Sequence, residues 1–209
     1  MAESTARGSR LLVVKVGGSL AKTGRLGRAL AMIRTARIPV VVVPGGGPFA
    51  ESVRNLQRTM QFDDAVAHRL AMLGMHQMAE LMVSIQDGFR VAQTLEQIAE
   101  VLGHGQVPVW APLPMMAEDA TVPAGWSATS DSLAARLTEL LGGPRLALLK
   151  SVDVEKGESA EELSRRGVVD PAFSTIVTRA GLSWSLFGPG NDEGFAAVLA
   201  GEAWGGANS

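Results

Sequence analysis

The sequence contains no cysteine among its 209 residues. This absence excludes disulfides, zinc–thiolate sites, iron–sulfur clusters and cysteine nucleophiles, and it is compatible with a reducing compartment. No apolar run approaches the roughly 18 residues that a membrane-spanning helix needs, and the polar stretch MAESTARGSR lacks the apolar core of a signal peptide. We therefore expect a cytoplasmic protein with no membrane partner.

The sequence also has little net charge and few aromatic residues. Lysine and arginine number 19 against 21 acidic residues, which gives a formal net charge of −2, and aromatic residues make up 5%. Basic side chains are scattered and no stacking surface is evident, so a nucleic-acid partner is not expected. A hydrophobic content of 46% is normal for a folded domain. Any anion-binding site must therefore be local.

Apolar runs and helical spacings alternate along the chain. The runs predict strands at 11–16, 40–43, 107–113, 146–149 and 184–187, and the spacings predict helices in 24–37, 49–58, 63–85, 93–103 and 130–141. This alternation favours a largely parallel sheet with helices on both faces, a three-layer α/β/α sandwich. We expect a flexible tail at 1–9 and a single domain over 10–209.

The longest predicted helix, residues 63–85, carries methionines at spacings of three and four. They are Met72, Met75, Met78 and Met82. Core packing explains this pattern better than contact with a cofactor. The same helix has more apolar surface than one core face requires, which favours a homo-oligomer.

Two predicted strands end in glycine-rich loops, VVKVGGS with Gly17 and Gly18, and VVVVPGGGP with Gly45, Gly46 and Gly47. Backbone N–H groups at the carboxyl edge of a parallel sheet form phosphate-binding sites, and a Cβ would block close approach of the phosphate. Neither loop has the spacing of a Walker A motif or of GxGxxG. Each loop alone is weak evidence for a phosphate site.

Lys15 lies inside the first apolar strand, two residues before its glycines. A buried ammonium needs an anion, and phosphoryl transfer needs cations to neutralise the transferred group. Lys15 could equally extend to the surface or pair with a structural carboxylate.

A third element, WSATSDSLAARL, places Thr129, Ser130 and Asp131 at the start of a predicted helix. Such side chains commonly cap free N–H groups, so an ordinary helix cap is the alternative to a functional role. The informative feature is the order of segments: lysine strand, triple-glycine strand, TSD helix, and then the strand LALLKSVDV.

These segments, in this order, resemble the amino acid kinase superfamily, which includes aspartokinases, acetylglutamate kinases, uridylate kinases and isopentenyl phosphate kinases. The resemblance covers roughly residues 11–153. It implies an amino acid kinase-like fold and ATP-dependent phosphoryl transfer with Mg²⁺, without a cluster of protein metal ligands. It also implies an acceptor half over about 10–143 and a shortened nucleotide half over about 144–209.

The resemblance assigns roles to individual residues. Lys15 would stabilise the transferred phosphoryl group, and Asp131 would organise the catalytic lysines. Phosphate and substrate binding would involve Gly17, Gly18, Ser19, Gly45, Gly46, Gly47, Arg54, His68, Thr129 and Ser130, and nucleotide binding would involve Lys150, Ser151 and Asp153. For Arg54 and His68 a solvated helix face is the alternative.

Within the superfamily, the helix DDAVAHRLAMLGMHQMAELM and the stretch from APLPMM to SLAARL look most like short members associated with methanofuran biosynthesis. That resemblance implies a small phosphorylated or carboxylate-bearing acceptor, specifically the phosphate of (5-(aminomethyl)furan-3-yl)methyl phosphate. An acceptor that already carries phosphate needs a second anion pocket.

The chain departs from the family pattern in its C-terminal half. It has only Lys15, Lys22, Lys150 and Lys156, no GGM segment, and Gly205-Gly206 where a closing GT is usual. Either Lys150 or one of Arg165, Arg166 and Arg179 would have to replace the second catalytic lysine, although arginine is not equivalent to lysine there. A non-catalytic protein of the same fold, which stores an anion or nucleotide or serves as a partner subunit, is therefore the competing hypothesis.

Overall fold

The computed structural model describes residues 11–155 and 157–202. The expected tail at 1–9 and the closing Gly205-Gly206 lie outside these residues. No helix in the described part of the chain combines the length and the apolar character needed to cross a membrane.

The described residues form one six-stranded sheet in the order β3-β4-β2-β1-β5-β6, and every pair of neighbouring strands is parallel. The strands are β1 (Leu12–Val16), β2 (Val40–Pro44), β3 (Phe89–Ala92), β4 (Val107–Trp110), β5 (Arg145–Leu149) and β6 (Trp184–Phe187). The predicted largely parallel sheet is thus confirmed. Its central strand β1 pairs with β2 on one side and β5 on the other, so these three strands end at the same edge.

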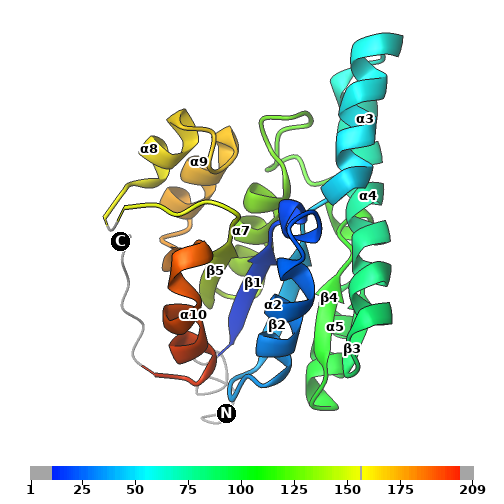
Figure 1. Cartoon of the computed structure of the whole chain (residues 1–209). Helices are drawn as coiled ribbons and strands as arrows, with labels where there is room; N and C mark the ends of the chain where they lie inside the picture. The colour runs from blue at the N-terminus through cyan, green and yellow to red at the C-terminus, as the bar shows by residue number, and fades with distance from the viewer. Residues whose placement is uncertain (1–10, 156, 203–209) are drawn as a thin grey trace.

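Helices cover both faces of the sheet (Figure 1). They are α2 (Arg25–Arg34), α3 (Gly47–Met60), α4 (Asp64–Ile85), α5 (Leu95–Gly103), α6 (Leu113–Met116), α7 (Ser130–Leu140), α8 (Ala160–Arg165), α9 (Pro171–Arg179) and α10 (Asp192–Leu199), with short 3₁₀ helices η1 (Gly18–Ala21) and η2 (Pro189–Asn191). Alternate residues of β1 belong to different cores: Val13 packs with residues of α7 and α9, and Val14 packs with residues of α2 and α10. This alternation gives the predicted three layers.

The two glycine-loop strands and the sixth strand lie where the sequence predicts them, but β3 has no counterpart in the prediction. It is only four residues long, and Phe89 and Ala92 at its ends are its fully buried members. So short a run at the sheet edge does not show a strand periodicity. Helices α8, α9 and α10 also were not predicted, and the strand expected over 107–113 ends at Trp110 because α6 begins at Leu113.

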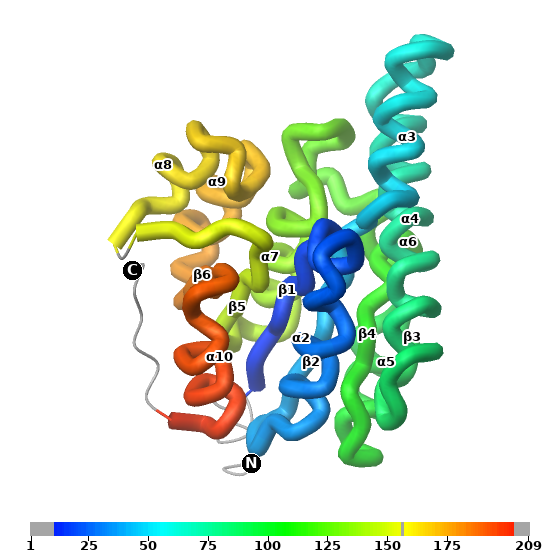
Figure 2. The backbone as a smooth tube through the Cα atoms, in the orientation of Figure 1, coloured from blue at the N-terminus to red at the C-terminus, as the bar shows by residue number. Residues whose placement is uncertain are grey.

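Helices α3 and α4 pack against each other and extend beyond the carboxyl edge of the sheet (Figures 1 and 2). They approach closely at Gly74, where a Cβ would lie 3.0 Å from the backbone nitrogen of Ala50. The four methionines of α4 are all at most 4% exposed, which confirms their predicted role in core packing. Because α3 buries none of its residues completely, its inner face is available to line a cavity.

Candidate active site

The two glycine loops touch each other at the carboxyl edge of the sheet. The Gly45 N–H donates to the carbonyl of Val16 (2.8 Å), and a Cβ on Gly18 would lie 2.3 Å from the backbone nitrogen of Gly47. Gly47 itself has φ of +53°, in the left-handed region that glycine tolerates. The glycines are therefore needed for backbone-to-backbone contact between the loops, as well as for any contact with a ligand.

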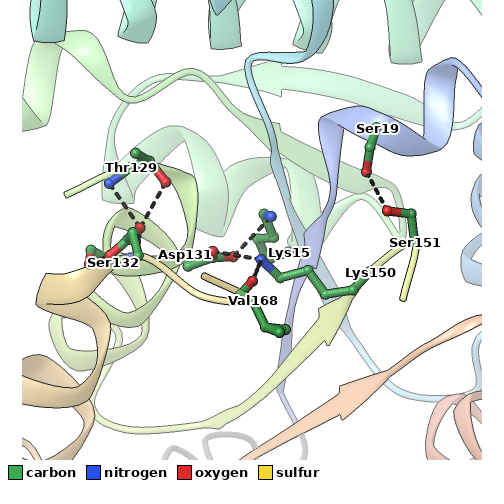
Figure 3. Close-up of polar contacts among 9 residues, drawn as sticks. Lys15, Ser19, Thr129, Asp131, Ser132, Lys150, Ser151 and Val168 are labelled. Carbon is green, nitrogen blue, oxygen red and sulfur yellow. Dashed lines mark hydrogen bonds and ion pairs between the residues drawn. The ribbon is translucent and has the colours of Figure 1, made fainter. Parts of the chain in front are cut away.

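A buried carboxylate lies between two lysines beside these loops, and Figure 3 shows both lysine side chains converging on it. The Lys15 ammonium is 2.9 Å from Oδ1 of Asp131, and the Lys150 ammonium donates to Oδ2 at 2.6 Å. Lys150 also donates to the carbonyl of Val168 at 2.6 Å. Lys15 and Asp131 are each 4% exposed. We call Lys15, Asp131 and Lys150 the lysine–aspartate centre.

Electrostatics keep this centre ionised. Burial opposes ionisation of Asp131, but the two ammonium groups outweigh it and lower the pKa of the carboxyl to about 2. Burial lowers the pKa of Lys150 to about 8 despite the attraction of Asp131, and the neighbouring Lys15 adds to the lowering. The centre therefore carries one more positive than negative charge near pH 7, which suits an anionic ligand.

The first turn of α7, which carries Asp131, is held by a residue that the sequence did not indicate. Asp170 accepts hydrogen bonds from the backbone N–H and the hydroxyl of Thr129, both at 2.8 Å, and from the backbone N–H (3.1 Å) and hydroxyl of Ser132. Thr129 makes no side-chain cap of its own. The alternative that the Thr129 side chain is an ordinary helix cap does not hold, because a carboxylate from the segment before α9 accepts the hydrogen bonds of this turn.

A cavity of about 240 Å³ opens between the glycine loops, α3, α4 and the loop before α7. Of the predicted binding residues, those that line it are Gly18, Ser19, Gly45, Gly46, Gly47, Arg54, His68, Thr129 and Ser130. Gly17 and the lysine–aspartate centre are not among its lining residues. The cavity is also lined by residues that were not predicted to bind a ligand, among them Lys22, Glu51, Met72, Met75 and Trp126. Only the folded chain brings Trp126 next to α3.

Trp126 and His68 attach the loop before α7 to the helices. The Trp126 indole N–H donates to Gln57 of α3 (2.6 Å), and the Arg54 guanidinium lies 4.3 Å from the centre of its ring. Nδ1 of His68 lies 3.1 Å from the carbonyl oxygen of Gly125, and because a carbonyl only accepts, this nitrogen carries the proton. Burial lowers the pKa of His68. The imidazole is thus neutral near pH 7 and links the loop to α4.

The predicted nucleotide-binding residues lie on the other side of β1. The Ser19 hydroxyl donates to the Ser151 hydroxyl at 3.0 Å, and Asp153 accepts from the backbone N–H of Gly190 at 2.9 Å. Asp153 therefore joins the loop after β5 to η2. The arginines considered as replacements for a second lysine pair elsewhere, Arg165 with Glu162, Arg166 with Glu158 and Arg179 with Glu139. Lys150 is the residue that the structure places beside Lys15.

Comparisons with known proteins indicate the family of the chain. Residues 10–161 match the model of the Amino acid kinase family. A curated protein of Methanocaldococcus jannaschii, [5-(aminomethyl)furan-3-yl]methyl phosphate kinase, is 26% identical over 144 residues, which span 68% of this chain and 66% of that protein, slightly less than two thirds of its length.

Solved structures show the same fold at low sequence identity. Uridylate kinase from Archaeoglobus fulgidus has a TM-score of 0.68 at 18% identity, and the match covers 95% of this chain and 99% of that one. Isopentenyl phosphate kinase from T. acidophilum has a TM-score of 0.61 at 11% identity, with 95% and 98% covered. With 95% of this chain covered, the structural match extends beyond residue 161, where the family match ends.

Ionisation of Asp131 should contribute measurably to stability. The pKa of its carboxyl is lowered in the folded protein, so its contribution is present above the unfolded pKa of about 3.8 and is lost as the pH falls from about 4 to 2. The size of the shift corresponds to roughly 2 kcal/mol. Urea unfolding of wild type and Asp131→Asn at pH 6 and pH 3 should show that the stability difference between them shrinks at the lower pH. A difference that is equal at both pH values would contradict this result.

Proposed function

Because the chain belongs to the amino acid kinase family, we propose that it is an ATP-dependent kinase that transfers the γ-phosphoryl group to a small acceptor. The observation that supports this most strongly is the lysine–aspartate centre beside two touching glycine loops. A pair of buried ammonium groups next to backbone N–H groups provides positive charge where a phosphoryl group in transfer needs it.

In the proposed reaction an oxygen of the acceptor attacks the γ-phosphorus of ATP, and the bond from that phosphorus to the bridging oxygen of ADP breaks. Lys15 stabilises the transferred group, Lys150 takes the role of the second lysine, and Asp131 fixes both ammonium groups. The N–H groups of Gly18, Gly46 and Gly47 bind the moving phosphate from the cavity side, whereas the N–H of Gly45 donates to Val16 and serves to hold the two loops together. The protein contributes positioning and charge, and no covalent intermediate on the chain is needed.

Mg²⁺ fits this site through the nucleotide rather than through protein ligands. No group of three or more histidine, aspartate or glutamate side chains within residues 11–155 and 157–202 could hold a metal ion. Mg²⁺ usually keeps several waters and binds phosphate oxygens. When carried by ATP it would neutralise phosphate charge. Ser151 and Asp153, after β5, remain our proposed contacts for the nucleotide, in a C-terminal half that begins near residue 144.

For the acceptor we propose (5-(aminomethyl)furan-3-yl)methyl phosphate, the compound named in the M. jannaschii relative. Three properties of the cavity support it. The glycine loops can receive the acceptor phosphate, the Met72, Met75 and Trp126 side chains offer apolar surface to a flat ring, and Glu51 is the acidic side chain among the lining residues. Glu51 would pair with the aminomethyl group. His68 would act through the loop it holds.

We also propose that two copies of the chain associate through α4. Its outer face carries an apolar stripe at helical spacing, comprising Val66, Leu70, Leu73, Leu81 and Ile85, each between 36% and 50% exposed. Leu56 and Met60 of α3 extend this exposed surface. The buried methionines occupy the opposite side of α4, so the stripe is not needed for the core of one chain. Exposed apolar surface of this extent on one helix is typical of an interface.

Turnover should depend on both lysines. We expect ADP formation from ATP and Mg²⁺ that requires the aminomethylfuran phosphate, is abolished in Lys15→Ala, and has a kcat lowered about 100-fold or more in Lys150→Met, as for loss of one preorganised charge donor. Arg28→Ala, which removes an exposed cation of α2, is the control and should behave as wild type. No turnover in a wild type that still binds ATP would favour the non-catalytic hypothesis instead.

We expect Glu51 to bind the amine of the acceptor. A charge-assisted hydrogen bond of about 1.5 kcal/mol corresponds to roughly a tenfold effect, so Glu51→Gln should raise KM for the aminomethyl acceptor about tenfold. KM for ATP, and for an analogue with methyl in place of aminomethyl, should not change. Glu100→Gln, at an exposed position of α5, serves as the matched control. An equal rise in KM for both acceptors would remove Glu51 from amine recognition.

Association through the apolar stripe should be sensitive to charge. Leu73→Glu is expected to convert a dimer to a monomer in sedimentation velocity experiments, because a carboxylate buried between two helices lacks a partner. Ala99→Glu adds the same charge to an exposed site on α5 and should leave the dimer intact. A wild type that sediments as a monomer at micromolar concentration would overturn the proposed interface.

A further inference from the structure

One short segment, residues 168–172, contacts Lys150 of the lysine–aspartate centre and the residues on either side of Asp131. The Val168 carbonyl accepts from the Lys150 ammonium (2.6 Å), Asp170 accepts four hydrogen bonds from Thr129 and Ser132, and the Ala172 N–H donates to the carbonyl of Ser127 (2.9 Å). Asp131 lies between Thr129 and Ser132 in the chain. The segment thus contacts residues before and after Asp131 in the helix turn from which this carboxylate projects.

The segment is itself firmly anchored. Val169 is 3% exposed and Phe173 is fully buried, where it packs edge-to-face on Trp184 of β6 with ring centres 5.2 Å apart. The Val168 N–H donates to the carbonyl of Leu163 at 2.8 Å. Because the core holds this segment on both sides, the segment can keep Lys150 and the first turn of α7 in fixed positions.

Asp170 is the part of this support that faces α7. It is 8% exposed and burial, together with the charge of Asp131, raises the pKa of its carboxyl. A buried carboxylate beside another carboxylate is unfavourable unless hydrogen bonds offset the cost. All four of the hydrogen bonds described above come from the two residues that flank Ser130 and Asp131. Asp170 therefore stabilises one particular position of that turn.

We propose that Asp170 is a positioning residue for phosphoryl transfer, which holds the first turn of α7 so that Asp131 meets Lys15 and Lys150 together. It touches neither lysine and acts only through Asp131. The inference rests on the proposed kinase function. In it, Asp170 determines the geometry of the lysine–aspartate centre and does not bind substrate.

Kinetics provide the first test. In Asp170→Ala, kcat should fall about 100-fold while KM for ATP and for the aminomethylfuran phosphate stays within about threefold, since a displacement near 1 Å can have that effect without loss of binding. The control is Glu139→Gln, because Glu139 also joins α7 to α9, through Arg179 (2.7 Å), but at the far end of α7. It should lower the melting temperature and leave kcat within about threefold.

Titration of Lys150 provides a test that needs no turnover. The chain has four lysines, so ¹³C-lysine labelling with the Lys150→Arg variant for assignment can follow its Cε signal against pH. The charged groups facing the Lys150 ammonium are Asp131 of α7 and Lys15 of β1. If Asp131 is displaced, its attraction weakens, and the midpoint of the Lys150 titration should move to lower pH in Asp170→Ala. It should not move in Glu139→Gln.

The outcomes are decisive. Wild-type kcat and an unmoved Lys150 midpoint in folded Asp170→Ala would overturn the inference, as would a kcat loss that Glu139→Gln reproduces. If Asp170→Ala does not fold, Asp170→Asn retains the shape and one accepting oxygen, and about a tenfold loss of kcat with a lowered midpoint is expected. Absence of kinase activity in wild type would refute the proposed function, while the lysine titration would still test the role of Asp170.

Discussion

Two ammonium groups are stable side by side in a protein interior only where an anion such as a carboxylate lies between them, and the carboxyl edge of this sheet meets that requirement. Lys15 is on the central strand and Lys150 directly follows the neighbouring strand β5, so parallel pairing brings both to one edge of the sheet. Asp131 comes from α7, the helix that precedes β5 in the chain. Its carboxylate uses one oxygen for each lysine. Removal of the carboxylate alone would leave two buried charges that repel each other.

The second constraint is the contact between the glycine loops. A Cβ on Gly45 would lie only 2.5 Å from the backbone nitrogen of Gly18. Such an approach requires that β1 and β2 are neighbours and end at the same level. The same contact places the N-terminus of α3 beside the lysine–aspartate centre, and α3 then continues away from it as one wall of the cavity. In the proposed reaction, a reacting phosphate and the body of an acceptor would therefore lie in adjoining surroundings. The first is charged and formed by backbone, and the second is lined by side chains of α3, α4 and the loop before α7.

Local sequence was informative where local physics decides the structure. Valine runs that end in glycine mark β1 and β2, and the buried ammonium of Lys15 requires an anion whichever fold surrounds it. The sequence left open whether Lys150 or one of three arginines replaces the second catalytic lysine. The arginines near α8 and α9 are also close in sequence, and only their ion pairs with Glu158, Glu162 and Glu139 place them away from Lys15. Asp170 gave no signal, since it lies about forty residues beyond the turn that it caps and looks like an ordinary residue before a proline. Trp126 is similar: its contacts with Gln57 and Arg54 depend on how the loop crosses α3.

The same charge arrangement links stability to ligand binding. The lysine–aspartate centre combines two ammonium groups with one carboxylate, and burial lowers the pKa of Lys150 by more than the attraction of Asp131 raises it. A phosphate at this edge would supply the missing negative charge, so the protein with ligand is electrostatically more favourable than the protein without it. This electrostatic stabilisation is greatest when the ligand carries the most negative charge. A phosphoryl group in transfer meets that condition, because it lies between two anionic partners. For that benefit to act on the transition state, the lysines must not follow the ligand as it moves. In the proposed reaction a carboxylate fixed to a buried helix turn would prevent this movement, so Asp131, rather than either lysine, would determine where the transferred group can lie.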